Sequence, residues 1–195
     1  MRAAITTLLL SFYFVSVGQI IEYRHDSLFV NSFFVDAQTS KSVIDSLLNT
    51  KGKTKTSKDK DRINPATGKK LVLRTDFYYT LGLFFRRYDY DTTKLSVGIK
   101  LYRDTDAKED RQSELTKPFA GELYIADNYL NDKRTLDQLQ QLKNCRVTTS
   151  TASLSSYSTL LGGDIMCLKN IIRLSFDRQT SELKSVFIHH NFQDR

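Results

Sequence analysis

The sequence is poor in the residues that most often build reactive centres. Its 195 residues include three histidines and two cysteines. No spacing of histidine or cysteine resembles a zinc signature, and no G-x-S-x-G segment marks a nucleophilic serine. No Asn-x-Ser/Thr sequon occurs either, so N-glycosylation is not expected. These absences disfavour motif-bearing enzymes and metalloproteins, and we predict no catalytic residue, no metal ligand and no cofactor.

The three histidines, His25, His189 and His190, supply the alternative to that prediction. A secreted hydrolase could pair His25 or His190 with a carboxylate on the concave face of a sheet. A metal site would need one of the tandem histidines together with His25 and a carboxylate such as Asp194. Neighbouring strand residues point to opposite faces, so His189 and His190 do not enter one site together.

Long hydrophobic runs are absent beyond the N-terminus. Arg2 precedes an apolar stretch, and the small residues Ser16 and Gly18 stand just before the expected cleavage point. This is the layout of a secretory signal peptide, which we predict over residues 1–18. The protein is then secreted, with one domain over 19–195 and no transmembrane span after cleavage. An uncleaved membrane anchor is the alternative.

The two cysteines, Cys145 and Cys167, form an even pair. In an oxidising compartment such a pair predicts a disulfide. The bond would close a loop of 22 residues and stabilise the fold by about 3 kcal/mol. Two free buried thiols are the alternative if the chain is not secreted.

Apolar residues are nevertheless sufficient for a sizeable core, at 40% of the chain with 12 Phe and 10 Tyr. The densest run is Leu71–Tyr102. Its second half alternates apolar and polar residues with a period of two, which predicts a β-strand. Phe77–Tyr88 alternates similarly, and the polar residues 89–93 suit a hairpin loop. We predict an antiparallel hairpin at the centre of a sheet.

Weaker patterns predict the remaining elements, which begin with strand or helix at 20–36. We further predict a helix over Lys41–Asn49 capped by Thr39 or Ser40, a strand over Phe119–Ile125, a helix capped by Asn131 or Asp132, an edge strand over Arg146–Ser158, a turn at 162–164 and a hairpin over Ile171–Ile188. The sum is an α+β domain with a curved, mostly antiparallel sheet of five to seven strands and two or three short helices on one face. A β-sandwich is the alternative.

Charge supplies the main functional indication. The chain carries a formal net charge of +7, and residues 51–70 contain eight basic and two acidic residues. With almost no apolar surface, this segment is predicted to be a mobile, solvated loop. Such a loop could serve solubility alone, or it could bind polyanions through a set of basic residues: Lys51, Lys53, Lys55, Lys58, Lys60 and Arg62. Secretion favours anionic lipid or glycosaminoglycan over nucleic acid.

Aromatic and basic residues also mix around Phe84–Tyr90. Nucleic-acid-binding sheets show this mixture, but stabilising cross-strand pairs explain it equally well. We therefore predict a secreted, non-catalytic binding or interaction module that engages a protein or a polyanionic partner. A secreted hydrolase and a carrier of a small apolar ligand are the alternatives.

Overall fold

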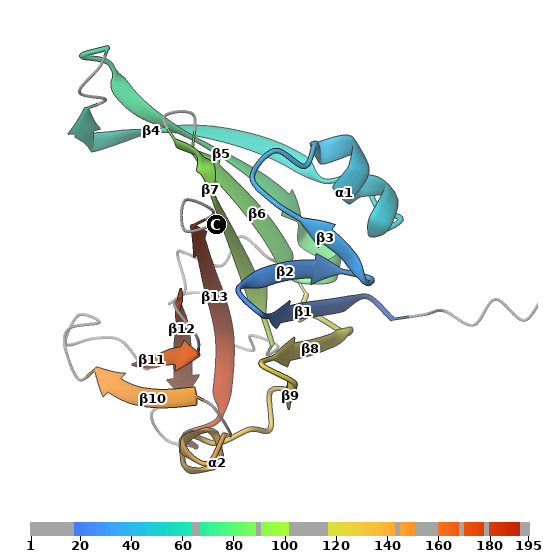
Figure 1. Ribbon diagram of the computed structural model, residues 1–195, viewed down its shortest axis with the longest axis vertical. Coiled ribbons are helices and arrows are strands. Elements are labelled where there is room, and N and C mark those ends of the chain that lie inside the picture. The colour runs from blue at the N-terminus through green and yellow to red at the C-terminus, as the bar shows by residue number, and fades with distance from the viewer. Residues whose placement is uncertain are drawn as a thin grey trace, which may run out of the picture.

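The computed structural model describes residues 18–63, 67–88, 91–101, 117–142, 145–150, 160–167, 170–177 and 180–191. This part of the chain is predominantly β. It forms an eight-stranded antiparallel sheet, a five-stranded mixed sheet and two short α-helices (Figure 1).

The larger sheet has the strand order β10-β11-β12-β13-β7-β6-β5-β4, and every neighbouring pair is antiparallel. Its central strand β7 is buried on both faces from Leu95 to Lys100. The strands are β4 (Lys53–Ile63), β5 (Lys70–Tyr78), β6 (Leu83–Tyr88), β7 (Asp91–Lys100), β10 (Cys145–Ser150), β11 (Leu160–Cys167), β12 (Asn170–Asp177) and β13 (Leu183–Asn191).

The smaller sheet has the order β3-β2-β1-β8-β9. Its hairpins close through two-residue turns, at 25–26, 31–32 and 126–127, in which both residues have positive φ. This geometry matches the type I′ turn, whose twist suits antiparallel strands. Strand β1 pairs in parallel with β8, which makes the sheet mixed. The strands are β1 (Ile20–Arg24), β2 (Ser27–Val30), β3 (Phe33–Val35), β8 (Glu122–Ile125) and β9 (Asn128–Leu130).

One hydrophobic core joins the two sheets. Tyr23 of the smaller sheet and Phe85 and Phe176 of the larger sheet are fully buried and belong to the same cluster. Burial of each such side chain contributes about 1.5–3 kcal/mol relative to exposure. The two sheets are therefore stabilised by the same apolar surface.

Helix α1 (Lys41–Leu47) makes hydrogen bonds to residues of both sheets or their turns. Ser40 caps its first turn by accepting a backbone N–H, as predicted, and Ile44 is buried in the shared core. At the other end of the helix, the Asn31 side chain donates to the carbonyl of Leu47 at 2.7 Å. Because Asn31 belongs to the β2–β3 turn, this bond ties the helix to the smaller sheet.

Helix α2 (Leu136–Gln140) begins after Thr135, so the predicted caps Asn131 and Asp132 are wrong. The Gln138 side chain instead accepts the N–H of Thr135 at 3.2 Å. The carboxamide of Asn131 accepts a backbone N–H within the preceding turn. Asn131, four residues before the N-cap Thr135, thus stabilises a turn and does not cap the helix.

The prediction of one sheet with five to seven strands is only partly confirmed. The antiparallel sheet, the central β6–β7 hairpin and the β12–β13 hairpin are present. The described residues, however, form two sheets and only two short helices, so the fold is mostly β and not α+β. The difference arises because residues 20–36, for which the sequence allows either a strand or a helix, form three strands of a separate sheet.

Two local predictions are wrong. The alternating run Phe77–Tyr88 is not one strand, because a 3-10 turn and Gly82 reverse the chain between β5 and β6. Gly82 has φ 66°, and a Cβ there would lie 2.4 Å from the nitrogen of Phe119. The predicted turn at 162–164 lies inside β11, where both neighbouring strands pair with it.

The predicted signal peptide lies outside the described residues, apart from Gly18. Across the described ranges, no helix combines the length and the apolar character needed to cross a membrane.

Candidate binding surface

Residues 53–63 of the lysine-rich segment form an edge strand, so the prediction of a mobile loop over 51–70 is wrong for this stretch. Strand β4 lies at the end of the larger sheet, with β5 as its neighbour. Lys53 stands opposite Phe77, and Thr54 stands opposite Asp76. Main-chain hydrogen bonds to β5 compensate for the missing apolar side chains, and the interleaved threonines favour an extended backbone.

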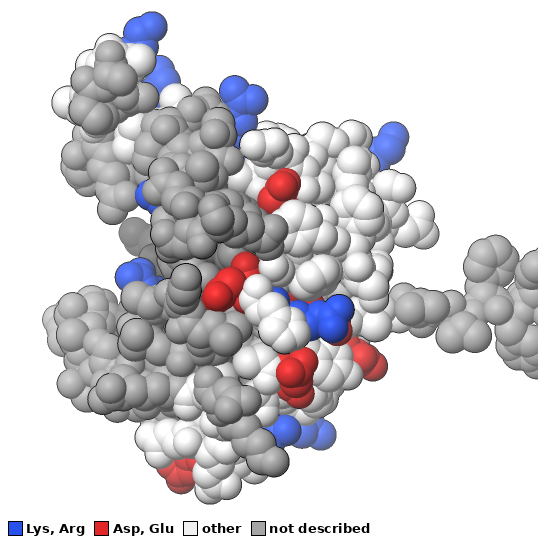
Figure 2. Space-filling model, viewed as in Figure 1, with Lys and Arg blue, Asp and Glu red and all other residues white. Residues whose placement is uncertain are grey.

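The described lysine side chains of β4, and Lys51 just before it, are exposed. Lys51, Lys53, Lys55 and Lys58 are all exposed, and basic side chains stand on the arm formed by β4 and β5 in Figure 2. From Lys53 to Lys58 the strand advances about 17 Å. The other two predicted polyanion-binding residues, Lys60 and Arg62, belong to β4, but their side chains lie outside the described part.

Lys55 is oriented toward the face of the sheet by aromatic rings. Its Nζ lies 5.5 Å from the ring centroid of Phe77 and 5.9 Å from that of Tyr79. A cation at these distances is attracted by the negative face of each ring. The row of lysines is therefore continuous with an aromatic surface on β5.

That surface extends across the sheet as an aromatic row, formed by Tyr79, Phe77, Phe84 and Phe187. Neighbouring ring centroids lie 5.3, 5.7 and 5.6 Å apart. Gly98 of β7 stands between Phe84 and Phe187, and a Cβ there would lie 2.1 Å from the Phe84 ring. The glycine thus lets the two rings meet over the intervening strand.

The aromatic row lies on the face directed away from the core. Phe77 stands opposite Phe84 in the strand register, and Gly98 stands opposite both Phe84 and Phe187. Their sequence neighbours Tyr78 and Phe85 are buried in the core. Arg86 adds a second cation, with Cζ 5.3 Å from the Phe84 centroid and 6.0 Å from that of Phe187. The mixture of aromatic and basic residues around 84–90 indicates Phe84 and Arg86 from the sequence alone. Phe187 joins them because β13 pairs with β7, a strand distant in sequence.

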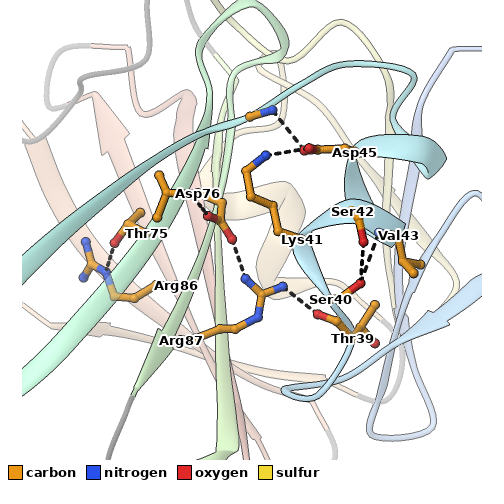
Figure 3. A network of polar contacts seen from close by, with 12 residues as sticks. Thr39, Ser40, Lys41, Ser42, Val43, Asp45, Thr75, Asp76, Arg86 and Arg87 are labelled. Atoms are coloured by element: carbon orange, nitrogen blue, oxygen red, sulfur yellow. Dashed lines mark hydrogen bonds and ion pairs between the residues drawn. The ribbon is translucent and has the colours of Figure 1, made fainter.

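A buried polar network holds β4, β5, β6 and the segment before α1 together (Figure 3). The Asp76 carboxylate is only 3% exposed, and it accepts from the Arg87 guanidinium and from the Thr54 hydroxyl at 2.6 Å. Arg87 also donates to the carbonyl of Thr39 at 2.8 Å. Buried charges are tolerated when they are paired and hydrogen-bonded in this way.

A second cluster fixes the start of β4 to α1. Asp45 accepts from Lys41 at 2.5 Å, from the Gly52 amide at 3.0 Å and from the Tyr78 hydroxyl at 2.8 Å. Partial burial raises the pKa of Asp45, but these hydrogen bonds and the charge of Lys41 outweigh it, so the pKa lies below its ordinary value. Burial and the bond to Asp45 raise the pKa of Tyr78 well above its ordinary value.

The polar side chains of these two clusters form hydrogen bonds with one another. The Asp76 carboxylate and the Asp45 carboxylate are each shared among donors from different elements. Such pairing positions the strands and anchors β4 at its beginning.

The histidines of the hydrolase alternative lie on different sheets. His25 is exposed in the β1–β2 turn, whereas His190 belongs to β13 of the larger sheet, opposite Leu95. The side chains of His189 and His190, and the whole of Asp194, lie outside the described part. Within the residues that are described, no group of three His, Cys, Asp or Glu side chains could hold a metal ion.

The two cysteines are placed opposite each other. Cys145 of β10 pairs in register with Cys167 of β11. Directly opposite residues of antiparallel strands have the Cα separation that a disulfide requires. The register therefore supports the predicted disulfide, which stays a prediction.

Comparison of the chain with protein-family models, with curated proteins and with solved structures finds no match in any of the three.

Proposed function

We propose that the chain is a secreted, non-catalytic binding module that holds a linear polyanion along strand β4. The observation that carries this proposal is the exposed set of Lys53, Lys55 and Lys58 on an edge strand, with Lys51 exposed just before it. Closely spaced ammonium groups attract an anionic chain and release its counterions, which makes the binding sensitive to salt.

Anchoring of the strand supports this function. The Thr54–Asp76 bond holds β4 against β5, and the Gly52–Asp45 bond holds the residue just before β4 against α1. Fixed lysines lose less conformational freedom on binding than lysines on a mobile loop would lose. The proposal therefore needs the strand, and a free loop would be a poorer site.

The shape of the row favours a sulfated polysaccharide over a membrane. Lys53 and Lys55 point to one side of β4 and Lys58 to the other, as the period of two requires. A chain can contact both sides of a narrow strand, whereas a flat lipid surface faces one side. Anionic vesicles therefore serve as a competing probe.

The test is heparin affinity as a function of salt. The double variant Lys53→Gln/Lys58→Gln should elute at lower salt, with the slope of log affinity against log salt reduced by about one per lysine. The control Lys117→Gln/Lys133→Gln removes the same charge from exposed positions outside β4 and should elute close to wild type. Equal losses in both variants, or preferential binding to phosphatidylserine vesicles, would overturn the proposal.

Secretion and the Cys145–Cys167 disulfide form part of the same proposal. Cys145 stands opposite Cys167 in the strand register, which supports the bond, and the bond would fix the start of β10 to the end of β11. Mass spectrometry of the secreted protein checks both: the mature N-terminus should be Gln19, and the intact mass should lack two hydrogens relative to the reduced chain. Alkylation of both thiols without prior reduction would refute the disulfide.

A further inference from the structure

We propose that the polyanion site of β4 continues across the larger sheet to β6, where Arg86 binds a sulfate group of the same polysaccharide chain. This extension rests on the function proposed for β4 and adds one residue to that site. Arg86 lies on the side of the sheet to which Lys53 and Lys55 point, so a chain bound there meets all three cations.

The strand register places Arg86 in line with Lys55. Thr75 of β5 stands opposite Lys55 of β4 and also opposite Arg86 of β6. Residues that stand opposite one another in neighbouring strands point to the same face, so the two cations share the outer face of the sheet. Their backbones are two strand spacings apart, which is about 10 Å.

The charge of Arg86 is not compensated in the way that the charge of its neighbour is. Arg87 points to the core side, where it pairs with the buried Asp76 carboxylate. Arg86 instead donates from Nε to the Thr75 hydroxyl at 3.2 Å, as Figure 3 shows. Within the described ranges, no carboxylate pairs with Arg86, so its positive charge can attract an external anion.

Two aromatic rings and a hydroxyl hold the Arg86 guanidinium in place. Its Cζ lies 5.3 Å from the ring centroid of Phe84 and 6.0 Å from that of Phe187. The bond to Thr75 uses Nε, which leaves the two terminal nitrogens to donate. A planar guanidinium held in this way can donate two parallel hydrogen bonds to the oxygens of one anionic group at little further cost in conformational freedom.

The surface between the cations suits an anionic chain better than a membrane or a nucleic-acid base. The residues that lie between β4 and Arg86 on this face are uncharged: Thr75, Phe77 and Phe84. Phe77 is only 8% exposed, and Lys55 lies over its ring. This ring therefore positions a cation and has little free surface to enter lipid or to stack on a base.

The experiment measures the affinity of the full chain for soluble heparin at several salt concentrations. Arg86→Gln should weaken binding about tenfold at a fixed salt concentration, because charge-assisted hydrogen bonds are lost. It should also reduce the slope of log affinity against log salt by about one. Arg86→Lys keeps the charge but not the planar fork, so it should keep the slope and lose less affinity than Arg86→Gln.

The matched control is Arg173→Gln. Arg173 is exposed on β12 and stands opposite Phe187, so it points to the same face as Arg86 but lies three strands away. This variant should bind heparin as wild type does. An equal loss in Arg173→Gln, or an unchanged slope in Arg86→Gln, would overturn the proposal. If Arg86→Gln does not fold, Arg86→Lys decides, and an affinity equal to that of wild type would overturn it.

The extension and the β4 site fail in different ways. A loss in Lys53→Gln/Lys58→Gln without any effect of Arg86→Gln would confine the polyanion to β4 and overturn the extension alone. Equal losses in the β4 double variant and its control Lys117→Gln/Lys133→Gln would overturn the β4 site, whatever Arg86→Gln does. If both proposals hold, combining Arg86→Gln with the β4 double variant should reduce the slope by about three.

Discussion

Single polar residues hold the β4 edge in place. Asp76 receives hydrogen bonds from two neighbouring strands, from Thr54 of β4 and from Arg87 of β6. Arg87 then reaches the backbone of Thr39, before α1. One buried carboxylate thus links three strands and, through Arg87, the segment that leads into the helix.

Arg87→Leu should lower the free energy of unfolding by about 3 kcal/mol, because it leaves the Asp76 carboxylate buried without its partner charge. Urea denaturation measures the change. Arg74→Leu is the control: Arg74 is the cross-strand neighbour of Arg87 and is exposed, so its loss should cost less than about 1 kcal/mol.

The same measurement on Arg87→Leu/Asp76→Asn separates charge from packing. Neutralising the carboxylate should recover part of the lost stability. Equal instability in the single and double variants would show that packing alone is responsible.

At the scale of elements, α1 and the start of β4 depend on the charge of Asp45. Its carboxylate joins the helix, Gly52 and Tyr78, and its pKa lies below the ordinary value. A depressed pKa in the folded state stabilises the fold when the pH is above the unfolded-state pKa. That contribution is lost as the pH falls through the folded-state pKa.

Asp45→Asn should therefore cost about 1–2 kcal/mol at pH 7, the usual effect of losing charge-assisted hydrogen bonds. The difference from wild type should shrink as the pH falls below about 4, the ordinary range of an aspartate. Urea denaturation at pH 7 and at steps below pH 4 tests this. A difference that stays constant with pH would mean that the charge of Asp45 does not stabilise α1.

Across the whole molecule, local sequence patterns predicted two kinds of element: strands in which apolar and polar residues alternate, and the helix that begins after a capping residue. The β12–β13 hairpin follows from alternation up to a polar turn, and Ser40 caps α1 as its residue type suggests. The β6–β7 pairing follows similarly, since both strands carry apolar residues at alternate positions.

Long-range pairing was not predictable in the same way. Strand β1 pairs with β8 although Ile20 and Glu122 are far apart in sequence, and nothing local in either segment specifies that partner. The smaller sheet depends on that pairing, so local patterns do not reveal it. Strand β4 was missed for a different reason: its hydrogen bonds are made by the backbone, and its side chains carry no apolar alternation.

The most direct test of the account is hydrogen exchange at the amides of residues 53–58. In an edge strand every second amide faces its neighbour and the others face solvent. We predict alternating protection along β4 in the free protein, with further slowing when heparin is added. Rapid exchange at every one of these amides would show a mobile loop and would contradict both the edge strand and the binding surface built on it.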